Sequence, residues 1–75
     1  MTLDATEFDV PVRVLSCAGL SVADRDRLDG LGLRPGASVV KIMRTPLRDP
    51  IECLVGSQLL AIEARLLAHI RVEAA

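Results

Sequence analysis

Two cysteines and one histidine are the residues of this chain best suited to bind a transition metal. Cys17, Cys53 and His69 supply the thiolate and imidazole groups that zinc and iron favour. Their wide separations match no compact metal-ligand motif, and Cys53 falls on the inward face of an expected strand. We therefore expect a buried structural thiol at Cys53, a surface or half-buried histidine at His69, and no bound metal or other cofactor.

Ser16 and Cys17 are the side chains that could act as catalytic nucleophiles. A nucleophile needs a base within hydrogen-bond reach, and the sole histidine, His69, is distant in sequence. The chain also contains no nucleophile elbow, paired-carboxylate motif or glycine-rich cofactor loop. The sequence therefore predicts a protein that is not an enzyme.

Glycines and a proline are concentrated in the stretch LDGLGLRPGASV, residues 28–39. A phosphate-binding loop would follow a strand and lead into a helix, whereas these glycines follow an expected helix and precede an expected strand. A structural corner accounts for each residue. Gly32 ends the helix, Pro35 fixes the first corner of a turn, and Gly36 supplies the positive φ of a type II turn.

The elements that would position these residues are mostly short strands. A helix is expected over 21–31, because Ser21 can accept from a free backbone N–H of the first turn and Asp24 favours that turn. A single helical turn is expected over 63–67. Leu28, Leu31 and Leu33 would close one end of the structure. Alternating apolar residues predict five strands, over 8–14, 37–44, 51–55, 60–62 and 69–73.

Length and composition limit the chain to one small domain with an aliphatic core. It has 75 residues, 51% of them hydrophobic, and Phe8 is its only aromatic residue. The net charge of −1 argues against nucleic-acid binding, because phosphate affinity needs a positive excess. No run is long and apolar enough for a membrane span, and no secretory signal is visible, so we expect a cytoplasmic protein.

Five short strands with one helix after the first predict a mainly β fold, a small five-stranded barrel. Closing the sheet into a barrel lets a short chain bury one face and leave few exposed edges.

Two linked motifs resemble the FeoA family, small SH3-like proteins of bacterial ferrous iron uptake. The stretch LGLRPG, residues 31–36, is similar to the family's Leu-Gly-Leu/Met-x-Pro-Gly corner. The stretch PLRDP, residues 46–50, is similar to its Pro-Leu-Gly-Asp-Pro segment, with Arg48 in place of the glycine. The resemblance covers about residues 8–73 and implies that residues 1–75 form one SH3-like domain.

The resemblance also implies a function and a partner. FeoA proteins are accessory or regulatory proteins, and the implied partner is the FeoB-type ferrous iron transporter, through its cytoplasmic GTP-binding domain. Any association with the membrane would then occur only through that partner, and a homo-oligomer stays open. Two alternatives stay open. One is a free-standing relative of the SH3-like C-terminal domain of metal-dependent transcriptional repressors, which would bind a repressor partner, and the other is a small enzyme without a recognisable catalytic motif.

Basic residues gather near the middle of the chain and could form a docking surface for an acidic partner. Arg34, Lys41, Arg44 and Arg48 lie within fifteen positions of one another. The simpler interpretation is that they are solvated strand and loop positions. Leu47, between two prolines, is either an exposed anchor for the partner or a cap on the barrel core.

Overall fold

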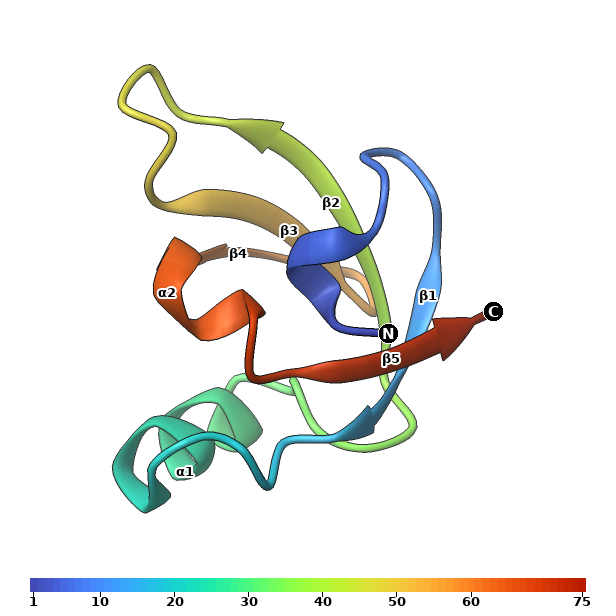
Figure 1. The fold of residues 1–75 in the computed structure, drawn as a ribbon, viewed down its shortest axis with the longest axis vertical. Coiled ribbons are helices and arrows are strands. Elements are labelled where there is room, and N and C mark those ends of the chain that lie inside the picture. The colour runs from blue at the N-terminus through green and yellow to red at the C-terminus, as the bar shows by residue number, and fades with distance from the viewer.

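A five-stranded antiparallel sheet curves around an aliphatic core and forms the body of the protein (Figure 1). The computed structural model describes all residues 1–75. The strand order is β4-β3-β2-β1-β5, which confirms the expected mainly β fold. The elements in chain order are η1 (Leu3–Ala5), β1 (Val12–Ser16), α1 (Val22–Gly30), β2 (Ser38–Arg44), β3 (Ile51–Val55), β4 (Gln58–Ile62), α2 (Ala64–Leu67) and β5 (Arg71–Ala74).

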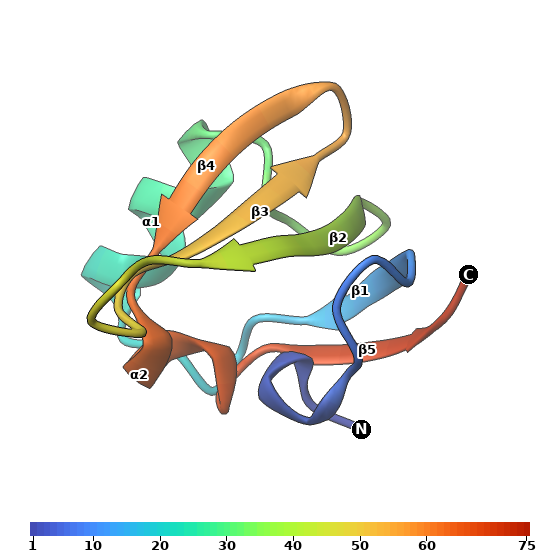
Figure 2. The ribbon, with the colours of Figure 1, turned by 90° about the horizontal axis from the view of Figure 1, so that it is seen from above.

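The core lies inside the curve of the sheet and is closed by the three helical segments (Figure 2). Each strand contributes alternate side chains, as the burial of Val12 and Val14 in β1 illustrates. Leu3 in η1 is fully buried, so the N-terminal segment belongs to this core although the family motifs begin later. Burying one such leucine contributes about 1.5–3 kcal/mol.

Helix α1 begins and ends as its capping residues predict. The Ser21 hydroxyl accepts a hydrogen bond from the Asp24 N–H at 3.1 Å, which satisfies a free donor of the first turn. Beyond the helix, the Leu33 N–H donates to the Leu28 carbonyl at 2.9 Å and brings both side chains into the core. Leu31 was expected beside them, but its side chain is 38% exposed, because the chain reverses direction after α1 and turns this residue outward.

The glycine-rich stretch forms the corner between α1 and β2. Gly32 and Gly36 have φ of +97° and +93°, a region that side chains with a Cβ rarely enter. The Ala37 N–H donates to the Arg34 carbonyl at 3.0 Å, which places Pro35 and Gly36 at the two central positions of a β-turn.

The first strand differs from the sequence prediction at its start. Alternation suggested a strand from Phe8, but β1 begins at Val12. Asp9 has φ +65°, and its N–H donates to the Lys41 carbonyl at 2.8 Å, so the chain turns there before pairing with the sheet. Phe8 is thereby held half-buried beside β2.

Candidate docking surface

The loop of residues 45–50 joins β2 to β3 and projects beyond the sheet (yellow in Figure 1). Leu47 is 87% exposed in this loop, which rules out a role as a cap on the core. Arg44 at the end of β2 and Arg48, which follows Leu47 in the loop, are also exposed. An exposed apolar residue thus lies between two exposed arginines along the chain, and we call Arg44, Leu47 and Arg48 the loop surface.

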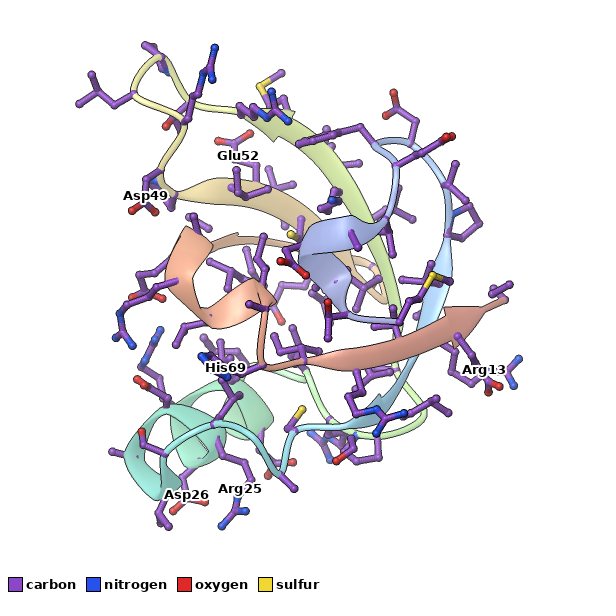
Figure 3. The ribbon with its side chains drawn as sticks, in the orientation of Figure 1. Arg13, Arg25, Asp26, Asp49, Glu52 and His69 are labelled. Carbon is purple, nitrogen blue, oxygen red and sulfur yellow. The ribbon has the colours of Figure 1, made fainter.

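Two hydrogen bonds restrain the loop. The Arg48 N–H donates to the Thr45 carbonyl at 2.8 Å, which closes a turn around Pro46 and Leu47. At the base of the loop, the Asp49 carboxylate accepts from the Ala64 N–H at 2.9 Å and ties the loop to the start of α2 (Figure 3). A loop restrained in this way loses little entropy when it binds.

Arg48 occupies a backbone conformation that favours glycine. Its φ is +63°, in the left-handed region where a Cβ is strained. The similar segment in FeoA proteins has glycine at this position, and the positive φ explains why glycine suits it. The backbone at position 48 would therefore be less strained with glycine than with the arginine that this chain has there.

Two of the five residues predicted to form a docking surface lie elsewhere. Arg34 precedes β2, whereas Arg44 ends it, so the length of the strand separates them by roughly 20 Å. Arg34 pairs with Asp29, with Nε 3.5 Å from the carboxylate. Lys41 is only 4% exposed, because the alternation of β2 points its side chain inward. Neither side chain contributes to the loop surface.

Exposed arginines of the protein differ in whether they have an acidic partner. Ion pairs engage Arg13, Arg27, Arg34 and Arg65, the first of these with Glu73. Arg44 and Arg48 form no such pair, so the charge of the loop surface is not neutralised within the chain. Arg25 and Arg71 are exposed and also unpaired, and they lie on other elements.

Phe8 connects the loop surface to the interior. The Arg44 Cζ lies 5.0 Å from the centroid of its ring, and the Lys41 Nζ lies 4.9 Å from the same centroid. Both are cation–π contacts, and that of Arg44 restrains an exposed side chain. The sequence pattern placed Phe8 in a strand, and its being the only aromatic residue was the one signal that pointed to a special role. No sequence pattern gave a role to Asp4, whose backbone carbonyl accepts a hydrogen bond from Lys41 Nζ at 3.3 Å.

A cavity of about 170 Å³ opens below the loop, between the end of β2, η1 and α2. Burial and the neighbouring Arg44 both lower the pKa of Lys41, and burial is the larger cause. The cavity is lined by Asp4, Phe8, Lys41, Arg44, Ile51, Ala64 and Leu67.

The cysteines and the histidine are not brought together. Cys17 and Cys53 are both buried as free thiols, as expected for Cys53, and His69 is exposed just before β5. Burial raises the pKa of Cys53 to about 11, partly opposed by Lys41. No three His, Cys, Asp or Glu side chains are grouped closely enough to hold a metal ion. No helix of the structure has the length and apolar character needed to cross a membrane.

Comparisons with known proteins identify similar sequences and folds. The FeoA domain model matches residues 1–74. The chain is 31% identical to the FeoA protein of Chlorobium tepidum, with a TM-score of 0.91 over 99% of this chain and 70% of that one. It is 29% identical to iron(II) transport protein A of Clostridium thermocellum, with a TM-score of 0.88 over 100% of this chain and 46% of that one. The chain thus spans about half the length of the Clostridium thermocellum protein.

Two further structures bear on the expected fold. FeoA of Stenotrophomonas maltophilia, solved as a complex with zinc and described as a prokaryotic SH3 domain protein, is 25% identical, with a TM-score of 0.78 over 97% of this chain and 89% of that one. This match confirms the SH3-like architecture. T. acidophilum IdeR shares the fold at 18% identity, with a TM-score of 0.81 over 100% of this chain and 34% of that one. No curated protein sequence matches the chain.

Proposed function

Because the chain belongs to the FeoA family, we propose that it is an accessory protein of ferrous iron uptake that binds the cytoplasmic GTP-binding domain of a FeoB-type transporter. One observation carries the choice of binding surface. Leu47 is 87% exposed on a restrained loop, between two arginines that have no acidic partner. An exposed apolar residue framed by unpaired charge is suited to an acidic surface that contains an apolar recess.

The two kinds of side chain have separate roles in this proposal. Leu47 enters the recess and buries apolar surface there. Removing the Leu47 side chain should therefore leave the association rate unchanged and increase the dissociation rate. Arg44 and Arg48 steer the encounter and fix its orientation, so their contribution falls as salt screens the charges. The bound protein acts by shifting the conformational equilibrium of the transporter domain and contributes no catalytic group to it.

The test is the affinity of the purified chain for the purified cytoplasmic domain of the transporter from the same organism, measured at low and high salt. Arg44→Glu/Arg48→Glu should weaken binding strongly at low salt, and Leu47→Ala should weaken it at both salt concentrations. The matched control is Arg25→Glu/Arg71→Glu, which changes the net charge equally at two exposed, unpaired arginines away from the loop.

Equal affinities for the two charge-reversed variants would contradict the proposed surface. Capture of a metal-dependent repressor in place of the transporter domain, from a lysate of the same organism, would favour the alternative function.

A further inference from the structure

Lys41 is a buried cation without an anionic partner. Lysine is almost never buried in proteins unless it is paired, yet this side chain is 4% exposed and lies in no ion pair. Its ammonium group has three N–H donors. One donates to the Asp4 carbonyl at 3.3 Å, and the Phe8 ring lies 4.9 Å away. The remaining hydrogen-bonding capacity of Lys41 is directed to no other group of the protein.

The cavity below the loop places this ammonium beside a second cation. Lys41 and Arg44 both line it and both contact the Phe8 ring. The one acidic residue in its wall is Asp4, and the Asp4 carboxylate already accepts a hydrogen bond from the Thr2 hydroxyl. The cavity therefore has two cations against one carboxylate, whose Oδ1 is hydrogen-bonded to Thr2, and a volume of about 170 Å³.

We propose that this cavity receives the carboxylate of a glutamate or aspartate side chain from the protein that docks on the loop surface, with Lys41 and Arg44 as its two cationic partners. The inference rests on the proposed function for the source of that side chain. A guanidinium matches a carboxylate with two parallel hydrogen bonds, and the largely buried ammonium of Lys41 supplies a point charge.

The other walls favour an acidic side chain over a free anion. Ile51, Ala64 and Leu67 present apolar surface to the cavity. The methylene stem of a glutamate can pack against such walls while its carboxylate reaches the cations, as the stems of other charged side chains do. A free phosphate has no apolar part to place there. Arg44 belongs both to the wall of the cavity and to the loop surface, so a partner that contacts Arg44 is next to the cavity.

The first experiment uses the chain alone. Backbone amide spectra of the ¹⁵N-labelled protein are recorded while N-acetyl-glutamate amide, N-acetyl-glutamine amide or inorganic phosphate is added. The glutamate compound should cause saturable shifts at residues that line the cavity, and the other two compounds should cause markedly weaker ones. Equal shifts with the glutamine compound would overturn it, and tighter binding of phosphate would show a free-anion site instead.

The second experiment compares Lys41→Met with wild type for affinity to the transporter domain. Methionine keeps the unbranched stem and removes the charge, so the variant should fold at least as stably. Affinity should fall by about tenfold or more, because a buried carboxylate would lose a charged hydrogen-bond partner. Arg71→Met removes an exposed charge from β5 and should change affinity little.

The two experiments separate the possible failures. Equal affinity of wild type and Lys41→Met would overturn the cavity inference and leave the proposed function standing. If the transporter domain binds neither protein, the proposed function fails, and the titration with the glutamate compound still decides whether the cavity takes a carboxylate.

Discussion

Replacing Arg48 with glycine should stabilise the protein while weakening its binding. Arg48 has φ +63°, and a residue with a Cβ costs about 1–2 kcal/mol in this region. Glycine removes that cost but makes the unfolded chain more flexible, which opposes the gain by about 0.5–1 kcal/mol. The difference predicts a net stabilisation of about 0.5–1 kcal/mol, or an increase in Tm of about 3–6 °C for a domain of this size.

The matched control is Arg48→Ala, which removes the guanidinium and keeps the Cβ. Because Arg48 is exposed and forms no ion pair, the alanine variant should unfold within about 0.5 kcal/mol of wild type. Thermal unfolding followed by circular dichroism measures both variants. A glycine variant no more stable than the alanine variant would refute the assignment of backbone strain to this position. Both variants should bind the transporter domain more weakly than wild type.

Three further predictions concern the corner, the thiols and acid stability. Gly36→Ala should destabilise the protein by about 1–2 kcal/mol through its φ of +93° alone, because nothing lies within 4 Å of an added Cβ. The control Gly30→Ala, at the end of α1, should cost no stability. Equal denaturation midpoints for the two variants would contradict this prediction. Cys53 is fully buried and its pKa is raised to about 11. At pH 8 a thiol reagent should therefore modify Cys53 more slowly than Cys17 in the native protein, as followed by mass spectrometry. Faster modification of Cys53 would contradict this prediction. A hydrogen bond from its own backbone N–H lowers the pKa of Glu63 in the folded protein. The stability that the ionised Glu63 contributes is therefore present above its unfolded pKa and is lost as the pH falls below about 4. Glu63→Gln should remove this loss of stability in acid, and a pH profile of unfolding identical to that of wild type would contradict the prediction.

Local patterns in the sequence were sufficient to predict most elements. Ser21 and Gly32 mark the ends of α1 through capping chemistry that acts over a few residues. The alternation of β3 likewise gave its buried face, because a strand that follows this pattern points every second side chain inward. Such short-range rules do not depend on the rest of the fold.

The parts that the sequence could not give depend on contacts between distant segments. Lys41 was expected on a charged face, but the burial of β2 on one side overrides the general preference of lysine for water. The role of Asp4 depends on a hydrogen bond across 37 positions, which no local pattern encodes. The positive φ at Asp9, which delays β1, was also unmarked by any glycine.

In the proposed complex, the loop surface and the neighbouring cavity form the contact with the transporter. The most direct measurement is the amide spectrum of the ¹⁵N-labelled chain as the unlabelled cytoplasmic domain of the FeoB-type transporter is added. The largest changes should fall on residues 44–50 and on Phe8, Lys41 and Ala64, with little change on α1. Changes centred on α1 and the neighbouring Cys17, with the loop unaffected, would contradict it.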